Sequence, residues 1–441
     1  MIPIYTLEEA KKSILIRKPI VDVSISPQIN DRIVELFGKS LTPLEVVKSI
    51  INDIIEKDDL ALIEWTKKLD KFDISNSIEI KSELLESALE SIDENVKEAL
   101  ICARDRIIAF HKAQPVSSWT TKELGGSLGQ IVTPIQRVGF YIPGGSAPLP
   151  STVIHSVSPA IVAEVEEIVI VSPPPISSII LATCNLMRDL YGKIRVFQIG
   201  GVQAIAALAY GTESVPKVSK IVGPGNIFVT LAKREVFGIV GIDGIAGPTE
   251  AMIFADETAN PDLIASDLLA QAEHDYLAIP IIITPSQNFA VNVKKSIEEQ
   301  FLNLPRFKIA EHAIKKNGGI IVVPNTEKAI STINDFAPEH LSIITKDPEL
   351  LLPLIKNSGG IFLGESSCEV LGDYIAGPSH VMPTGGAAKF SSPLSVLDFI
   401  KITSIISLDS KTVKSIAPLA EVLALNEELL AHSKAARRRS K

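Results

Sequence analysis

The sequence predicts an α/β protein with mostly parallel sheets, arranged in more than one domain. From Ile131 onward, short runs rich in Val and Ile alternate with stretches of helical periodicity, which is the pattern of βαβ units. A chain of 441 residues exceeds one typical domain. Aromatic residues make up 5% of it, so Ile, Leu, Val and Ala fill the apolar positions, as in helices packed on parallel sheets.

Nine short apolar runs are expected to be strands, because each is too short for a helix and lies between helical stretches. No internal repeat is evident in the sequence. The runs are Val138–Ile142, Glu167–Val171, Ile194–Ile199, Ile221–Val222, Ala251–Phe254, Ile279–Thr284, Gly319–Val323, Leu341–Thr345 and Gly360–Leu363.

Helices are expected before and after this region. The first forty or so residues are expected to be a short separate arm, and Thr42 and Glu45 then form a capping box with Pro43 in the first turn. Two long helical regions follow, 45–71 and 83–114. After Ser391 the chain is expected to become helical again, as a C-terminal arm.

Composition narrows the classes of function. The net charge of −9 argues against nucleic acid as a partner, and no segment reaches eighteen consecutive apolar residues, so no membrane span is expected. Three widely separated cysteines, Cys102, Cys184 and Cys368, form no CxxC motif. They fit a reducing cytoplasm without a disulfide framework or thiolate zinc cluster. No secretory signal is evident at the N-terminus.

Three glycine turns follow expected strands, at Gly144-Gly145, Gly200-Gly201 and Gly223-Pro224-Gly225. Glycines there allow backbone amides to approach a phosphate, and a helix N-terminus favours negative charge. The full GxGxxG fingerprint is absent, and each turn alone is more simply a structural turn. Together they predict a cleft at the carboxyl edge of a sheet.

A possible metal site begins with Gln271 and His274, three residues apart at the end of an expected helix. That spacing puts both side chains on one face, where a Gln oxygen and an imidazole suit zinc. Taken alone, such a pair is more often a solvated helix face or a packed polar edge. Asp373, in the aperiodic stretch 372–386, and His432 would complete a set without thiolates, although nothing in their spacing shows that the four converge.

Acid–base chemistry is suggested by Glu339-His340, adjacent residues whose side chains suit two separate proton transfers. The plainer interpretation is an exposed turn before a strand. Two other classes stay open: a zinc hydrolase with Glu339 as base, and a zinc-free aldehyde dehydrogenase with Cys368 as nucleophile. The adjacent Glu339 and His340 beside a candidate metal set disfavour a pure binding module. The hydrolase would not need three glycine turns, and a lone cysteine is more often inert.

Several long strings of the sequence closely resemble the histidinol dehydrogenase family. They occur in the same order between about Gly139 and Val396, and the family matches the N-terminal helices and the tail more loosely. The strings are GFYIPGGSAP, GGVQAIAALAYGTE, KIVGPGNIFVTLAKR, IDGIAGPTE, LLAQAEHD, FAPEHL and GGIFLGESSCEVLGDYIAGPSHVMPTGGAAKFSSPLSV.

The resemblance implies a fold of two incomplete Rossmann-like, three-layer domains related to aldehyde dehydrogenases, with small N- and C-terminal helical arms. The implied division is 1–36 as an N-terminal arm, 37–145 with 249–394 as a larger domain carrying most of the site, 146–248 as a second domain contributing to NAD binding, and 395–441 as a C-terminal arm. The family is a cytoplasmic homodimer in which this arm reaches the partner's active site.

The resemblance also implies site residues and a reaction. L-histidinol would be oxidised by two NAD through L-histidinaldehyde to L-histidine, the last step of histidine biosynthesis, with one zinc ion per subunit. Carried over by position, the zinc ligands are Gln271, His274, Asp373 and His432; the acid–base pair is Glu339 and His340; the NAD contacts are Tyr141, Gln203 and Asn226; further substrate contacts are Thr249, Glu369, His380 and Glu427.

Two positions depart from the family pattern. Thr249 stands where the family usually has Ser, which keeps the hydroxyl but restricts its rotamers. Glu427 and His432 are five residues apart and would not share a face of one regular helix, so we expect a helix to start or end near them.

Overall fold

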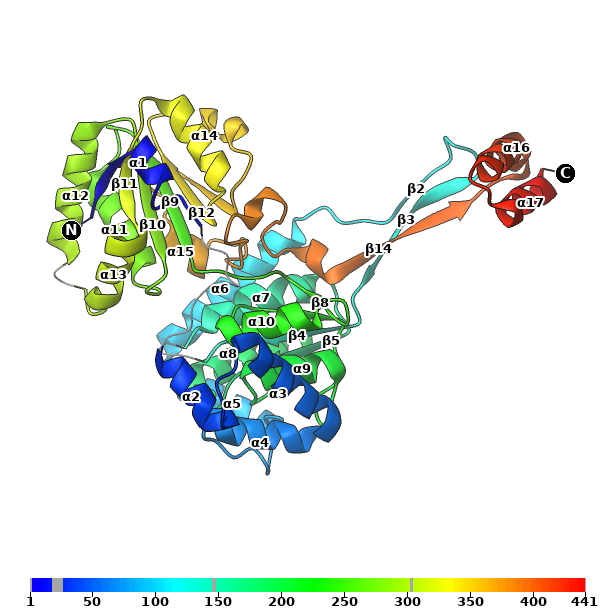
Figure 1. Ribbon diagram of the computed structural model, residues 1–441, viewed down its shortest axis with the longest axis horizontal. Coiled ribbons are helices and arrows are strands. Elements are labelled where there is room, and N and C mark those ends of the chain that lie inside the picture. The colour runs from blue at the N-terminus through cyan, green and yellow to red at the C-terminus, as the bar shows by residue number, and fades with distance from the viewer. Residues whose placement is uncertain (1, 18–26, 145–147, 302–303, 441) are drawn as a thin grey trace.

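The computed structural model describes residues 2–17, 27–144, 148–301 and 304–440. Figure 1 shows two α/β units side by side, each a parallel sheet with helices on both faces, and a long ribbon that ends in a pair of helices. This confirms the predicted α/β class with parallel sheets in more than one unit. None of the helices in these ranges is both long and apolar enough to span a membrane.

The first unit has a six-stranded, fully parallel sheet. Its four inner strands are largely buried on both faces because alternate side chains enter two separate cores, such as Ile253 in one and Met252 in the other. In spatial order the strands are β1 (Ile4–Thr6), β11 (Gly319–Val322), β10 (Ile279–Thr284), β9 (Glu250–Ala255), β12 (His340–Ile344) and β13 (Gly360–Leu363). One face carries α11 (Pro261–Ala272), α12 (Gln287–Phe301) and α13 (Phe307–Asn317), and the other α1 (Leu7–Lys11) and α14 (Thr326–Phe336).

The second unit has a five-stranded parallel sheet, again between two helical layers. In spatial order its strands are β6 (Ile194–Phe197), β5 (Glu167–Val171), β4 (Arg137–Tyr141), β7 (Lys220–Val222) and β8 (Gly241–Ile242). One layer holds α2 (Pro27–Phe37), α3 (Pro43–Lys57), α4 (Asp59–Leu69), α9 (Gly201–Tyr210) and α10 (Ile227–Val236); the other holds α5 (Ser82–Ser91), α6 (Glu94–Lys112), α7 (Pro150–Val162) and α8 (Ser178–Tyr191).

The two sheets share one strand order. Numbered along the chain within each unit, β9 to β13 and β4 to β8 both run 3-2-1-4-5, with β1 added at the edge of the larger sheet. This is most of the Rossmann order, with a switch point between the first and fourth strands. The repeat of topology was not visible in the sequence.

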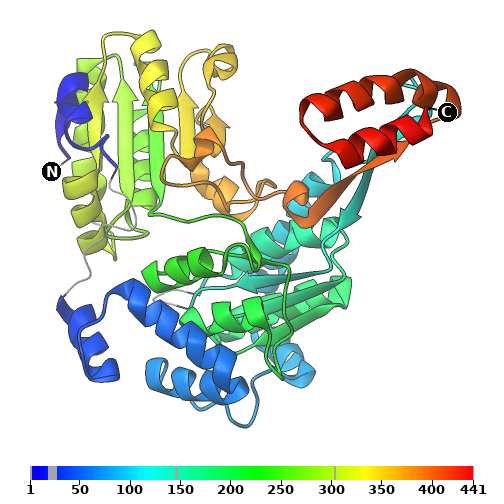
Figure 2. The same cartoon turned by 45° about the vertical axis from the view of Figure 1, so that its right-hand side comes forward.

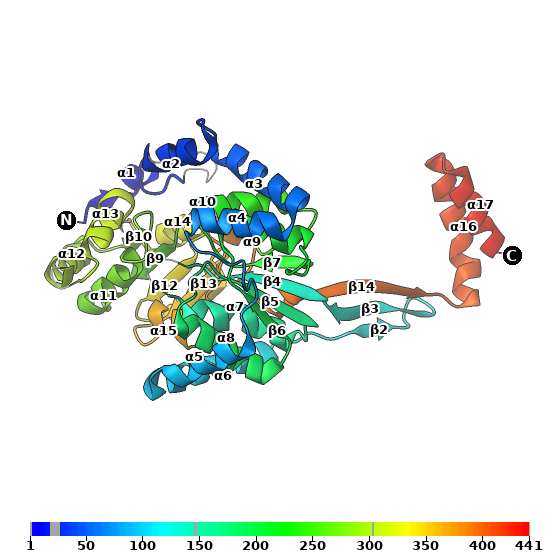
Figure 3. The ribbon, with the colours of Figure 1, turned by 90° about the horizontal axis from the view of Figure 1, so that it is seen from below.

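The C-terminal region contains a strand where helix was expected. β14 (Ile400–Ser407) pairs antiparallel with β3 (Ser127–Pro134), which also pairs with β2 (Trp119–Thr121). The expectation of helix from Ser391 was wrong here, because residues 400–407 pair with a strand from far away in the sequence. This ribbon extends from the body to α16 (Ser410–Asn426) and α17 (Leu430–Arg439) (Figure 3).

The N-terminal part is packed differently from the expected division. β1 joins the larger sheet, whereas α2 packs on the smaller unit, so residues 1–36 do not form one separate arm. Helices α3 to α6 also pack on the five-stranded sheet, as Figure 2 shows, and not with residues 249–394. Long-range packing determines which sheet each helix covers. The sequence of a helix by itself does not indicate which of the two sheets it packs on.

Local signals in the sequence were more reliable. The Thr42–Glu45 capping box forms as expected, and Asn260 caps α11 with Pro261 in its first turn. All nine expected strands exist, with ends that differ by two residues at most. The expected helical region 45–71 is interrupted at Asp58, whose φ of 57° separates α3 from α4.

We expect Gly200→Ala to destabilise the protein by about 1–3 kcal/mol, because a Cβ there would lie 2.5 Å from Pro173 Cγ in a fully packed turn. Gly244→Ala is the matched control, since its Cβ would meet nothing within 4 Å. Thermal unfolding midpoints measure both. Equal midpoints for the two variants would contradict the close packing of this turn.

Candidate active site

A cleft of about 830 Å³ lies between the two units. The six-stranded sheet contributes the amino ends of β9 and β12 through Thr249, Glu339 and His340, while Pro224 comes from the turn after β7. The amino edge of one sheet therefore faces the carboxyl edge of the other. Gln271, His274, Asp373 and His380 line the same cleft.

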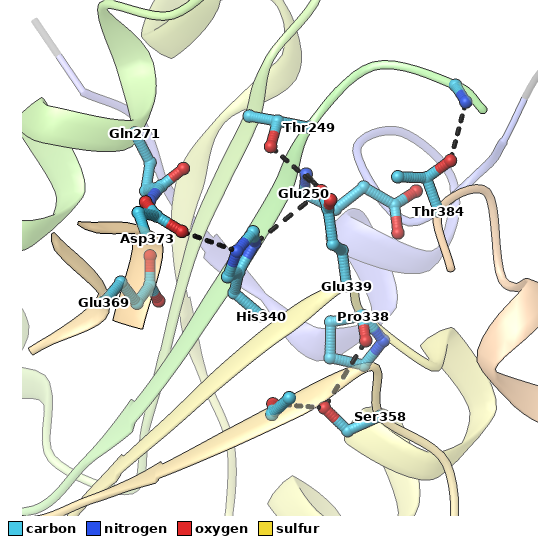
Figure 4. Close-up of polar contacts among 12 residues, drawn as sticks. Thr249, Glu250, Gln271, Pro338, Glu339, His340, Ser358, Glu369, Asp373 and Thr384 are labelled. Atoms are coloured by element: carbon cyan, nitrogen blue, oxygen red, sulfur yellow. Dashed lines mark hydrogen bonds and ion pairs between the residues drawn. The ribbon is translucent and has the colours of Figure 1, made fainter. Parts of the chain in front are cut away.

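Glu339 is buried, and its carboxylate accepts two hydrogen bonds (Figure 4). Its Oε2 atom accepts from Thr249 Oγ1 at 2.9 Å and from the backbone N–H of Glu250 at 3.0 Å. Burial raises the pKa of Glu339, which outweighs the lowering effects of His340 and of these hydrogen bonds. A carboxyl group whose pKa is raised in this way is suited to general acid–base catalysis.

His340, the first residue of β12, lies between two carboxylates. Its Nδ1 is 3.6 Å from Glu339 Oε2 and its Nε2 is 3.4 Å from Asp373 Oδ1. Neither ring nitrogen has a hydrogen-bond partner among the described residues. Burial lowers the pKa of His340, but the surrounding carboxylates, Glu339 foremost, overcome this and raise it to about 10. The arrangement favours a proton on this imidazole.

Three of the four predicted metal ligands lie together. Gln271 Nε2 donates to Asp373 Oδ2 at 3.2 Å, and His274 faces the same cleft. The helix α11 ends at Ala272, so His274 lies just beyond it and does not share a helical face with Gln271 as expected. A Gln oxygen, an imidazole and a carboxylate fit a zinc site that keeps an open position, and they lie at the negative end of α11.

The fourth predicted ligand is far from the cleft. His432, on α17, is exposed at the tip of the ribbon, and so is Glu427. Within the part of the chain described, no three His, Cys, Asp or Glu residues group around a metal position. The expected helix break is confirmed: α16 ends at Asn426, α17 begins at Leu430, and Glu428 between them has a φ of 61°.

Two further predicted substrate residues surround the same centre. Glu369 is buried behind His340, where its Oε1 accepts from Ser342 Oγ at 3.0 Å and burial raises its pKa to about 7. It does not line the cleft. His380 does, and its Nδ1 is 2.8 Å from the carbonyl oxygen of Asp373.

Sequence analysis missed His155 in α7, a fully buried residue of the smaller unit. Its ring stacks on that of His380 with centroids 4.1 Å apart, and its Nδ1 accepts a hydrogen bond from the His380 N–H at 3.1 Å. A polar residue in a long apolar helix was the available signal. His155 links the smaller unit to the loop that carries His380.

The described glycines of the three predicted turns lie at the carboxyl edge of the five-stranded sheet, as expected; Gly145 lies outside the described residues. Gly144 and Gly200 both pack on Pro173, and Gly223 packs so closely on the carbonyl oxygen of Tyr141 that a Cβ would lie 2.2 Å from it. The N–H of Gly223 donates to Asp243, and its carbonyl oxygen accepts from the buried Lys233. The turn at Gly223 is therefore closely packed and hydrogen-bonded.

The predicted NAD contacts lie at this edge. Tyr141 ends β4, and its hydroxyl accepts from the Gly201 N–H at 3.2 Å. Gln203 is buried and donates to Asp70, while its carbonyl oxygen lacks a partner among the described residues. Asn226 caps α10 by accepting from the N–H groups of Phe228 and Val229. Two helix N-termini and an unpaired amide oxygen fit a dinucleotide.

Two parallel-sheet units with a buried glutamate–histidine pair in the cleft between them define an α/β enzyme built for proton transfer. The fold resembles that of an acetylating aldehyde dehydrogenase from Geobacillus thermoglucosidasius, with a TM-score of 0.50 over 83% of this chain and 97% of that one, at 14% identity.

The chain belongs to the histidinol dehydrogenase family, which makes it an oxidoreductase: the family's model matches residues 39–440. It is 48% identical to the histidinol dehydrogenase of Aquifex aeolicus over 88% of this chain and 90% of that one, and 40% identical to that of Deinococcus radiodurans over 99% of both. A crystal structure of histidinol dehydrogenase from Elizabethkingia anophelis has a TM-score of 0.90 at 35% identity, covering 99% of this chain and 98% of the other.

The pKa of Asp70, beside Gln203, predicts a pH-dependent stability. Burial raises this pKa to about 6, so folding stability falls as pH rises through the interval from its ordinary value to about 6. We expect Asp70→Asn to raise the unfolding temperature at pH 8 and to lose this gain toward pH 4. The side-chain oxygen of Asn can still accept the hydrogen bond that Gln203 donates at this position.

The control is Asp73→Asn, because Asp73 is exposed and hydrogen bonds from Ser75 lower its pKa. This variant should gain no stability at pH 8. Thermal scans across the pH range measure both variants, and a gain for Asp70→Asn that is equal at pH 4 and pH 8 would contradict the raised pKa.

Proposed function

We propose that this protein is a zinc-dependent histidinol dehydrogenase that oxidises L-histidinol through L-histidinaldehyde to L-histidine, with two NAD consumed. The proposal rests above all on one observation: the buried Glu339–His340 pair opens into the cleft that Gln271, His274 and Asp373 also line. Acid–base groups thus lie beside a donor set suited to a substrate-binding metal ion. By its family, the enzyme acts in histidine biosynthesis, and we propose a cytoplasmic location.

Gln271, His274 and Asp373 would hold the zinc ion together with His432, and Tyr141, Gln203 and Asn226 would contact NAD. When bound, zinc orients the substrate through its nitrogens and NAD accepts hydride. Thr249, Glu369, His380 and Glu427 would complete the substrate site. Thr249 already donates to Glu339, so its hydroxyl would help to fix the carboxylate as well as face substrate.

The two catalytic residues divide the proton transfers. His340 would accept the proton of the substrate hydroxyl in the first oxidation. Its imidazole must be neutral when the substrate binds, and the carboxylates on both sides then stabilise the imidazolium that forms. Glu339 would then take a proton from water, which adds to the aldehyde carbon to give the hydrate. The carbon–hydrogen bond of that hydrate is broken in the second oxidation.

We infer that the active site is completed by a second copy of the chain. His432 and Glu427 lie at the end of the ribbon, away from their own cleft, and α16 and α17 bury few side chains. Leu419, Leu423 and Leu430 are each more than 60% exposed on these helices. An apolar tip on a long ribbon suits a homodimer in which each arm supplies the neighbouring site.

The alternative mechanism, a zinc-free aldehyde dehydrogenase with Cys368 as the nucleophile, lacks support. Cys368 precedes α15 (Glu369–Tyr374) and does not line the cleft. A nucleophilic cysteine would have to face the substrate.

We expect the purified protein to form two NADH for each L-histidinol consumed, measured by absorbance. Complete zinc removal with a chelator should abolish the activity, and zinc should restore it. Failure to form NADH would contradict the dehydrogenase function, while full activity without zinc would contradict only the metal's role. Holding magnesium constant during chelation controls for unspecific effects.

Mixed dimers test the shared site. Co-expressed His274→Ala and His432→Ala chains should regain about half of the wild-type activity per heterodimer, because one of its two sites contains no substitution. Co-expressed His274→Ala and Gln271→Ala chains are the matched control, since both lesions lie in the cleft and every mixed site carries one of them. Equal activity of the two mixtures, in confirmed heterodimers, would show that the arm does not serve its neighbour.

A further inference from the structure

Arg17, in the segment after α1, binds Glu250 through both carboxylate oxygens. Its Nε donates to Oε1 at 2.7 Å and its Nη2 to Oε2 at 2.6 Å. Only 20% of the Arg17 side chain and 2% of the Glu250 side chain are exposed. The guanidinium also lies 3.7 Å from the centre of the Phe336 ring. This is a desolvated, bidentate ion pair stacked on an aromatic ring.

The same guanidinium binds the carbonyl oxygens at the end of α14. Nη1 donates to Phe336 and Nη2 to Ala337, the latter at 3.3 Å. Ala337 has a φ of 53°, a left-handed conformation that is unfavourable for a residue other than glycine. The chain continues from it directly into Pro338, Glu339 and His340. Arg17 therefore holds the backbone from which both catalytic side chains project.

Glu250 connects this pair to the catalytic carboxylate. It is the first residue of β9, and its N–H donates to Glu339 Oε2 at 3.0 Å. The titratable or charged groups facing Glu339 are His340 on its own strand and Glu250 on the neighbouring one, with Arg17 behind Glu250. Two buried carboxylates this close compete for protons unless a cation neutralises one of them.

We propose that Arg17 is a positioning residue for the acid–base pair: it fixes the turn at Ala337 and neutralises Glu250, so that Glu339 carries the negative charge that catalysis requires. This rests on the proposed function of Glu339. The alternative is a purely structural ion pair that ties the N-terminal segment to the sheet.

Variants separate the two roles. Arg17→Met removes the charge and keeps most of the length, Glu250→Gln removes the opposing charge, and the double variant removes both. The matched control is Arg195→Met in the smaller unit, because Arg195 also binds a carboxylate in bidentate fashion, Glu79 at 2.9 and 2.7 Å, and lies 5.0 Å from the Phe197 ring. The zinc-loaded enzyme is assayed for kcat and KM against pH.

For Arg17→Met we expect the acid limb of kcat to move to higher pH by about one unit, a tenfold loss on the acid side, because the unpaired Glu250 disfavours ionised Glu339. KM for histidinol should change less than about threefold, since no metal or substrate contact is removed. The double variant should return the limb to its wild-type position. Arg195→Met should leave kcat and the limb unchanged.

An unmoved limb in folded Arg17→Met, or a double variant with the same shift, would overturn the proposal in favour of the structural role. If Arg17→Met does not fold, Arg17→Lys carries the test, because it keeps the charge but loses the bidentate geometry and the stacking. It should lower kcat without moving the limb. Wild-type kcat in Arg17→Lys would then contradict the positioning role.

A wild-type protein that does not oxidise histidinol would contradict the proposed function and not this inference. In that case the inference is tested by titrating the Glu339 carboxyl. Infrared difference spectroscopy monitors this titration, with Glu339→Gln as the reference that identifies the signal. Arg17→Met should move that titration upward, and the double variant should reverse the shift. A titration that Arg17→Met leaves in place would overturn the proposal.

Discussion

The cleft depends on the burial of ionisable groups, each of which needs a partner. A continuous series of polar contacts runs from Arg17 through Glu250, Glu339 and His340 to Asp373 and Gln271. A single buried ionisable group without a partner would shift its pKa and become neutral. Here the neighbouring groups of opposite charge and the amides allow several groups to stay charged. The fold brings these groups from five separate parts of the chain to one edge of one sheet.

The two units share a strand order but have different roles, because opposite edges of their sheets face the cleft. In the smaller unit the glycine turns follow the strands, so the carboxyl edge presents backbone amides and helix N-termini, which suit a phosphate-bearing cofactor. In the larger unit the reactive side chains precede β9 and β12, so its amino edge presents acids and bases. One edge of each sheet faces the cleft, and stacked His155 and His380 join the units beside it.

Local signals in the sequence were sufficient for most of the fold, because caps, turns and short apolar runs act over a few residues. The capping box of Thr42 and Glu45 and the nine strands behave as expected. Long-range pairing was not predictable: β14 has exposed apolar residues, such as Ile406, and becomes a strand only because β3 pairs with it. In the site, the adjacent Glu339 and His340 could be recognised from the sequence as candidate acid–base residues. The importance of Arg17 and His155 could not, because it depends on the residues that they contact in the fold.

The geometry of the candidate metal site also explains why its completion must come from elsewhere. Gln271 and Asp373 satisfy each other at 3.2 Å, and His274 lies beyond the end of α11 with access to the cleft. Three donors of this kind leave a zinc ion open to further ligands, which substrate nitrogens can supply. His432 lies on α17, at the end of a ribbon whose strands β3 and β14 pair antiparallel over eight residue pairs, and away from the cleft of its own chain. In the homodimer that we propose, this arm with its exposed imidazole and exposed leucines would complete the neighbour's site, and dimerisation and catalysis would then depend on one another.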